Sequence, residues 1–133
     1  MKLVAAISMV SDVVQVSTGA LRFSQTSAGG SGRAEGLRES MGRQGYVGDP
    51  VDVVQTNEGL VTIDNTRVAV AKELGIENIP ARVHSPSESL PPDMKGRFGS
   101  ATTWGEAVTY RTSTQNPPLP PTGTTQMPRM PKP

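Results

Sequence analysis

The chain has 133 residues with 13 basic and 12 acidic side chains, so its length fits one domain and its net charge of +1 provides no general attraction to nucleic acid. The absence of cysteine excludes disulfide bonds, a thiol nucleophile and thiolate metal sites. The single histidine, His84, excludes a multi-histidine zinc centre.

Residues 1–30 are expected to precede the folded domain. Residues 3–10 are apolar and follow Lys2, but Asp12 comes soon afterwards and no signal-peptide cleavage site follows. We therefore expect a short helix or strand packed on the domain, or a remnant of a longer chain. Residues 24–32 are rich in Ser, Thr and Gly, which is typical of a flexible linker. No apolar run has the length of a membrane span.

Residues 31–116 are predicted to form the domain, beginning with a helix and a hairpin. Ser31 can cap a helix that Gly45 ends. Strands are expected at residues 50–55 and 60–63, because apolar β-branched residues there flank a turn containing Asn and Gly.

The second half of the domain is also predicted to alternate between helices and strands. A helix is expected at residues 66–74 and a short strand at residues 79–84, where Pro80 suits an edge strand or a strand entry. Thr102 or Thr103 can cap a last helix. The pattern predicts an α+β fold, with a short mixed sheet and flanking helices. The Pro-rich residues 117–133 are predicted to be a disordered tail.

The junction between the second strand and its helix carries the polar residues of greatest interest. The N-terminus of a helix offers unpaired N–H groups and a partial positive charge, so it attracts anions. Asp64 and Asn65 are N-cap candidates, and Arg67 falls in the first turn, where it can contact a bound phosphate. The alternative is that Asp64 or Asn65 only caps the helix and Arg67 is solvated.

This order of elements resembles the ParB/sulfiredoxin superfamily. The resemblance rests on Pro-Val-Asp-Val-Val from residue 50, Val-Thr-Ile-Asp-Asn-Thr-Arg-Val-Ala-Val-Ala-Lys-Glu-Leu-Gly from residue 61, and Ile-Pro-Ala-Arg-Val-His from residue 79. More narrowly, these residues and the stretch from Thr103 to Gln115 resemble ParB-like nuclease domains of bacterial polymorphic toxins, of the Rhs and contact-dependent inhibition type. The resemblance covers residues 33–115.

The chain departs from the family pattern in the turn itself. Asn65 stands where Gly is usual, and Thr66 stands where many relatives have His or a second Arg. Sulfiredoxins have a cysteine in this turn, so the chain cannot perform sulfiredoxin chemistry. Too few residues remain for the separate DNA-binding region of ParB.

The proposed chemistry centres on two residues of this turn. Arg67 can hold two phosphate oxygens and stabilise charge in a transition state. Asp64 can orient a water, bind a divalent cation or accept a proton. The remaining predicted substrate contacts are Asn65, Thr66, Arg33, Arg111 and Gln115.

His84 is a third candidate catalytic residue, because the strand that it ends can reach the same edge of the sheet. The alternative is an ordinary surface or hydrogen-bonded histidine. Glu106, Arg111 and Gln115 share one helix face and can equally form a solvated face. The sequence does not identify a cofactor; a divalent cation such as magnesium could use Asp64 or Glu106 as a ligand.

The resemblance implies a nuclease toxin of interbacterial competition, with DNA favoured over RNA as the substrate. Such an effector is delivered by a secretion system into the cytoplasm of a target bacterium and is neutralised by a cognate immunity protein. The alternative is a ParB-like module that binds or hydrolyses a nucleotide without cleaving nucleic acid. The sequence leaves the oligomeric state open.

Overall fold

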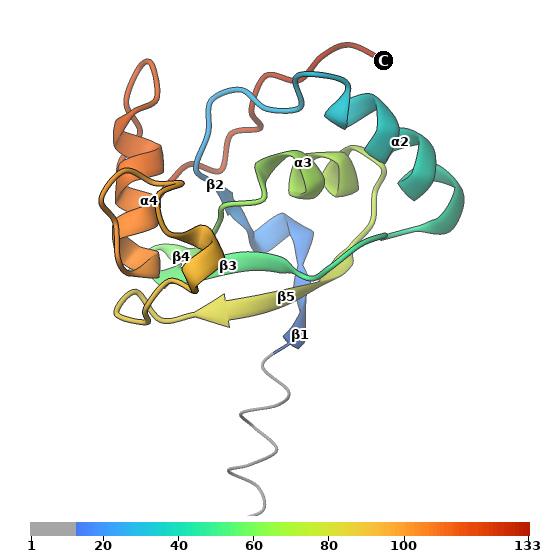
Figure 1. The fold of residues 1–133 in the computed structure, drawn as a ribbon. Helices are drawn as coiled ribbons and strands as arrows, with labels where there is room; N and C mark the ends of the chain where they lie inside the picture. The colour runs from blue at the N-terminus through green and yellow to red at the C-terminus, as the bar shows by residue number, and fades with distance from the viewer. Residues whose placement is uncertain (1–12) are drawn as a thin grey trace, which may run out of the picture.

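The computed structural model describes residues 13–133 (Figure 1). The apolar segment at residues 3–10, for which a packed helix or strand is expected, lies outside the described residues. Among the described residues, none of the helices combines the length and apolar character needed to cross a membrane.

A mixed five-stranded sheet forms the centre of the described structure, with the strand order β1-β5-β3-β4-β2. β3 and β4 form the predicted antiparallel hairpin, β5 runs parallel to β3, and β2 runs parallel to β4. The strands are β1 (Val13–Ser17), β2 (Arg22–Phe23), β3 (Val51–Thr56), β4 (Gly59–Thr62) and β5 (Asn78–His84).

Helices cover both faces of this sheet. Val53 and Val54 of β3 are adjacent, so their side chains point to opposite faces, and they belong to different apolar clusters. The cluster of Val53 includes α2 and α3, whereas that of Val54 includes α4 and the segment before it. The helices are α2 (Arg33–Gln44), α3 (Asn65–Glu73) and α4 (Trp104–Ser113), with short 3₁₀ turns η1 (Thr18–Ala20) and η2 (Pro92–Met94). The predicted α+β class, with a short mixed sheet and flanking helices, is confirmed.

α3 is buried on most of its surface because its side chains are small and apolar. Residues 68–71 are fully buried, as expected of a helix that is apolar all round. Arg38 of α2 donates two hydrogen bonds of 2.9 Å to the carboxylate of Glu73 at the end of α3. α2 begins one residue later than predicted after Ser31, since Gly32 is its N-cap and no side chain caps it.

The domain boundary expected at residue 31 differs from the structure, since residues 13–23 supply both edge strands of the sheet. β5 is therefore an inner strand, with Pro80 opposite Gln15 of β1. Edge strands take their stability largely from the backbone of a neighbour and need few apolar residues, so composition signals them weakly.

The C-terminal residues also differ from expectation. The sequence predicts a disordered tail at residues 117–133, whereas the structure places this segment, which we call the C-terminal strap, along β2 and the chain that follows it (Figure 1). Phe23 and Thr124 exchange backbone hydrogen bonds of 2.7 and 2.9 Å, and the Arg129 amide donates to the Thr26 carbonyl at 2.8 Å. The strap is ordered because its backbone finds partners beside β2.

Candidate functional site

Asp64 occupies the N-cap position of α3, but its carboxylate does not cap the helix. Instead, Asp64 Oδ2 accepts a hydrogen bond of 2.6 Å from the backbone amide of Asp52 on β3. The Asp64 side chain is thus held against the end of the hairpin and leaves the N–H groups of the first helical turn without a side-chain cap. Such a turn keeps its capacity to bind an anion.

Arg67 lies in the first turn of α3 and packs on the loop between α2 and β3. Its guanidinium covers Gly48, where an added Cβ would stand 3.3 Å from Arg67 Cζ. One of its terminal nitrogens donates to the Asp49 carbonyl at 3.2 Å. In residues 13–133, Arg67 Nε is buried without a hydrogen-bond partner, and no ion pair occupies the guanidinium. The Tyr46 hydroxyl lies within hydrogen-bonding reach of the guanidinium. Because its charge is not neutralised by an ion pair, Arg67 can attract an anionic ligand.

Two further arginines approach the same end of α3 from the α4 side. The guanidinium groups of Arg97 and Arg111 lie over the ring of Phe98, at 5.4 and 4.9 Å from its centroid. Arg111 also points a terminal nitrogen at the Ile63 carbonyl, 3.4 Å away. Burial lowers the pKa of Arg111, the charge of Arg97 lowers it further, and the charge of Asp64 opposes both. We call Arg67, Arg97 and Arg111 the arginine cluster.

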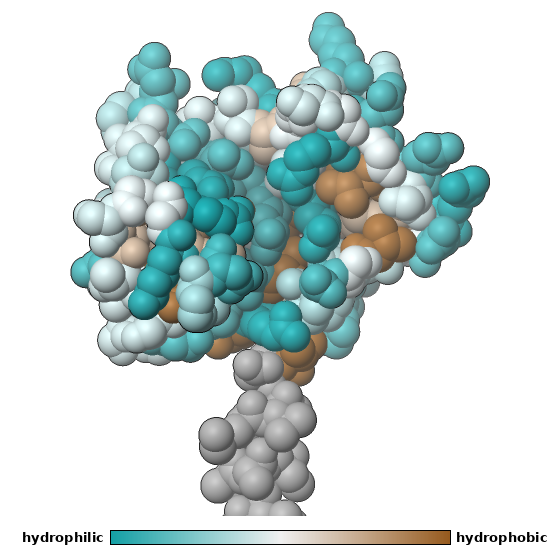
Figure 2. Space-filling model, in the orientation of Figure 1, coloured by the Kyte–Doolittle hydropathy of each residue, from teal (hydrophilic) through white to brown (hydrophobic). Residues whose placement is uncertain are grey.

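The pKa of the Asp64 carboxyl depends on its burial and on the charged groups around it. Burial raises the pKa of the Asp64 carboxyl, and the nearby charge of Asp52 raises it further. The hydrogen bond from the Asp52 amide and the charges of Arg67 and Arg97 oppose this shift without cancelling it. A carboxyl whose pKa is raised is suited to exchange a proton with a substrate. Figure 2 shows a mainly hydrophilic recess between the α4 part and the α2 part of this face of the molecule.

Asn65, a predicted phosphate contact, has a structural role instead. Its side chain is buried, and its Oδ1 accepts from the Ser24 amide at 2.8 Å while its Nδ2 donates to the Ser24 hydroxyl at 2.9 Å. That hydroxyl donates in turn to the Thr62 carbonyl at 2.7 Å. The Asn65 amide thus ties α3 to β4 and the chain after β2, and its burial keeps it from contacting a ligand.

Gln115 also makes structural contacts in place of the predicted substrate contact. Its Oε1 accepts from the Thr26 amide at 2.9 Å and from the Thr26 hydroxyl at 3.3 Å. Its Nε2 donates to the Arg111 carbonyl at 3.0 Å. These bonds connect the end of α4 to the chain after β2.

Thr66 and Arg33 line a separate cavity of about 570 Å³ beside the beginning of α2. The glycine-rich residues 29–31 form one wall, and Arg129 of the C-terminal strap forms another. Thr66 is only 4% exposed, and its hydroxyl has no hydrogen-bond partner among the described residues. The cavity thus presents two cations and a free hydroxyl on one side of the first turn of α3.

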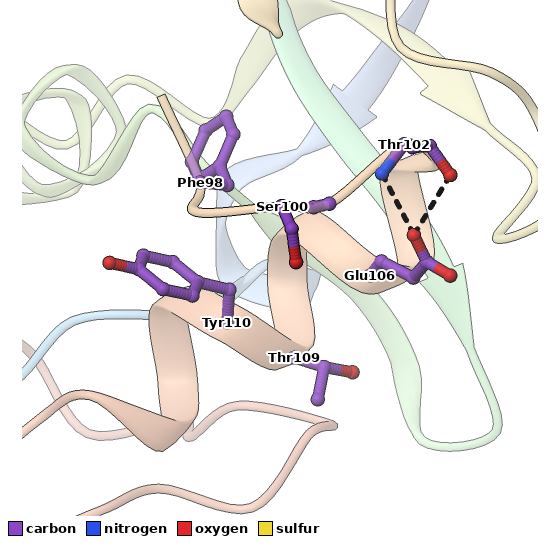
Figure 3. Close-up of a pocket in the computed structure, with 7 residues that line it drawn as sticks. Phe98, Ser100, Thr102, Glu106, Thr109 and Tyr110 are labelled. Atoms are coloured by element: carbon purple, nitrogen blue, oxygen red, sulfur yellow. Dashed lines mark hydrogen bonds between the residues drawn. The ribbon is translucent and has the colours of Figure 1, made fainter. Parts of the chain in front are cut away.

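Glu106 lies in the first turn of α4, whose N-cap is Thr103, and its carboxylate is engaged by Thr102. Its Oε1 accepts from the Thr102 amide at 2.8 Å and from the Thr102 hydroxyl at 3.0 Å (Figure 3). The Glu106 amide donates to the Thr103 hydroxyl at 3.2 Å. The hydrogen bonds from Thr102 lower the pKa of Glu106. Glu106 borders a shallow cavity of about 500 Å³, which Phe98 and Tyr110 also line (Figure 3).

His84 is buried at the end of β5 and is engaged on both ring nitrogens. Nε2 lies 2.8 Å from Asp52 Oδ1, and Nδ1 lies 2.7 Å from Glu88 Oε2. The ring stacks on Trp104 with centroids 3.8 Å apart and planes 11° from parallel. Because both nitrogens already have carboxylate partners, His84 is not a free general base in this arrangement.

The positions of Asp64, Glu106 and His84 bear on the predicted metal site and on the predicted catalytic group. Within residues 13–133, no group of three or more His, Asp or Glu side chains is placed to hold a metal ion, and Asp64 and Glu106 lie in no such group. Asp64, Arg67 and Arg111 come together, as the prediction requires, whereas His84 reaches Asp64 only through Asp52.

Two arginines near the first turn of α3 are missing from the predicted site. Arg97 follows η2 in a stretch without periodicity, and Arg129 lies in the strap, so no local signal in the sequence marks either one. The sequence shows that Arg97 and Phe98 are neighbours, but it does not show that the Arg97 guanidinium lies over the Phe98 ring.

Comparisons with known proteins give a likeness in structure only. No family model matches the chain, and no curated protein matches it. Among solved structures, the crystal structure of sulfiredoxin from Arabidopsis thaliana aligns with a TM-score of 0.44 and 14% sequence identity, covering 55% of this chain and 84% of that chain. Sulfiredoxin belongs to the superfamily that the sequence resembles, but a likeness at this level assigns neither a family nor an activity to the chain.

Proposed function

We propose that this domain binds phosphate groups of nucleic acid at the first turn of α3 and cleaves the phosphodiester backbone, DNA in preference to RNA. The observation that carries the proposal is the arginine cluster around Asp64, in which, among residues 13–133, no guanidinium group is held in a salt bridge of 4 Å or less. Cations placed around a phosphoryl group stabilise the charge that develops in the transition state. Asp64 would exchange the proton of the attacking water or of the leaving oxygen.

The biological setting proposed for this activity rests on the sequence resemblance to toxin domains. The domain would act as an effector that a secretion system delivers into the cytoplasm of a rival bacterium. A cognate immunity protein would neutralise it.

Arg67 and Arg33 lie on different sides of the first turn of α3, and this spacing suits a polymeric substrate. Successive phosphates of a nucleic acid strand could contact the two arginines.

A nucleotide is the second candidate ligand, and the cavity at the beginning of α2 favours it. At about 570 Å³ the cavity is within the usual range for small-molecule sites. Arg33, Arg129 and the Thr66 hydroxyl would contact the phosphates. Saturable binding of a nucleoside triphosphate without strand cleavage would support this alternative.

The decisive experiment compares cleavage by the purified chain and by Arg67→Ala. We expect the wild type to nick supercoiled plasmid and the variant to be slower by roughly 10²–10³-fold, the usual cost of removing one transition-state donor. Arg43→Ala is the matched control, since Arg43 is an exposed arginine near the end of α2 that does not belong to the cluster. Inducible expression in bacterial cytosol should arrest growth with degraded DNA for the wild type and Arg43→Ala only. Intact DNA and RNA across a panel of divalent metals would contradict the proposal.

A further inference from the structure

His84 lies between two carboxylates that come from different parts of the chain. Asp52 belongs to β3, and Glu88 belongs to the loop after β5. This loop carries the start of α4 with it, because the Trp104 amide donates to the Glu88 carbonyl at 2.9 Å and the Leu90 amide donates to the Thr102 carbonyl at 2.9 Å. The imidazole therefore connects the sheet to residues 85–104.

The protonation state of the His84 ring decides whether it can donate a hydrogen bond to one or to both of these carboxylates. A protonated imidazole has two N–H donors and can donate to both carboxylates. A neutral imidazole has one donor, so its other nitrogen presents a lone pair to a carboxylate and that contact becomes repulsive. The side chain of Glu88 is 46% exposed and that of Asp52 is 26% exposed. Glu88 can therefore be solvated at lower cost, and it is the partner that would separate.

We propose that Asp52, His84 and Glu88 form a proton-dependent clamp, which holds residues 85–104 against the sheet when His84 is charged and releases Glu88 when it is neutral. The clamp itself does not depend on the proposed function. Its effect on catalysis does, because residues 85–104 carry Arg97 of the arginine cluster.

Other charged groups around the ring fit this arrangement. Asp49 before β3, Asp93 of η2 and Arg82 of β5 line the same cavity of about 430 Å³ as His84. Trp104 covers one face of the ring and brings no charge. Asp52 and Glu88 are the carboxylates that contact the ring, and their hydrogen bonds and charges favour the imidazolium.

The direction of the titration follows from these contacts. Burial alone lowers the pKa of His84, but the hydrogen bonds and charges of Asp52 and Glu88 outweigh it, so the pKa is raised. Because the pKa of the folded state exceeds the ordinary value near 6.5, the clamp stabilises the structure fully below that value. Its contribution is lost as the pH rises through the raised pKa.

The clamp also reaches the proposed catalytic carboxylate. Asp52 uses its side chain for His84 and its backbone amide for Asp64, so one residue links the two groups. Under the proposed function, cleavage by the wild type should decline as His84 loses its proton, because Arg97 then lies on a less firmly held segment.

The chain offers two unique reporters for the test, since it contains one histidine and one tryptophan and these two rings are stacked. NMR of the imidazole C2–H and fluorescence of Trp104 should titrate together, with a midpoint above 6.5. Glu88→Gln and Asp52→Asn should each lower the midpoint, and the double variant should bring it to 6.5 or below, since mainly burial then acts. Asp93→Asn is the matched control, as Asp93 lines the cavity without a hydrogen bond to His84, and it should leave the midpoint nearly unchanged.

Hydrogen exchange supplies the structural readout. Above the midpoint, the amides of Leu90 and Trp104 should exchange at least several-fold faster than below it, after correction for intrinsic rates, while the amides of residues 68–71 in α3 should not change. A midpoint at or below 6.5, or one that Glu88→Gln leaves unchanged, would overturn the clamp. A protein without nuclease activity at any pH that still shows the titration would refute the proposed function and support the clamp.

Discussion

Replacing Asn65 with alanine separates a structural role from a ligand-binding role at the first turn of α3. The substitution removes the acceptor of the Ser24 amide and the donor to the Ser24 hydroxyl. Ser24 is fully buried, so its unpaired amide costs about 1–3 kcal/mol, and the second bond contributes about 1 kcal/mol more. The free energy of unfolding should fall by roughly 2–4 kcal/mol, which lowers Tm by about 10 °C.

Urea denaturation monitored by circular dichroism measures this loss, and nucleic-acid affinity is measured at a temperature where the variant is folded. We expect the affinity per folded molecule to stay within about twofold, because the Asn65 amide is buried and bonded to Ser24. A double-mutant cycle with Ser24→Ala, which keeps the Ser24 amide, should give a coupling energy of about 1 kcal/mol. Unchanged stability combined with a large loss of affinity would refute the structural role.

Two other substitutions test the environment of Asp64 and the C-terminal strap. Since the raised pKa of Asp64 makes its ionised form unfavourable in the folded state, the stability that the protonated acid provides is lost as the pH rises through that pKa. Asp64→Asn should therefore melt at a higher temperature than the wild type at pH 7, and this difference should vanish near pH 3. The variant should also cleave DNA at least 10²-fold more slowly. A lower melting temperature of the variant at pH 7 would contradict the reasoning. Gly123→Ala should destabilise the fold by about 2 kcal/mol or more, because Gly123 has a φ of +73° and an added Cβ would clash with the Phe23 carbonyl oxygen. Limited proteolysis should then cut residues 117–133 before the rest of the chain, and an uncut strap would argue against its attachment through Gly123.

The parts of the fold that could be predicted from the sequence are those with local signals. The hairpin of β3 and β4 follows from two apolar runs around Asn57 and Gly59, and α4 begins after Thr103 as its capping pattern indicates. α3 also lies within one residue of its expected bounds. These elements depend on interactions between residues close in sequence.

The rest of the fold and site depends on partners distant in sequence. β2 has two residues, which no propensity scale marks as a strand, and it exists because β4 and the C-terminal strap flank it. Likewise, the sequence predicts that Asn65 is a capping residue at a helix end, and only the contact with the distant Ser24 reveals its structural role. Arg97 joins the cluster only because Phe98 packs in the apolar cluster of α4.

The placement of β1 and β2 has a consequence for how this protein can be handled. The same eleven-residue stretch, 13–23, borders the sheet on both sides, so a recombinant fragment beginning at residue 31 would leave the backbones of β5 and β4 bare at once. Uncovered strands of this kind recruit other copies of the chain. Such a fragment should precipitate or form higher-order species, and activity measurements on it would report on aggregates.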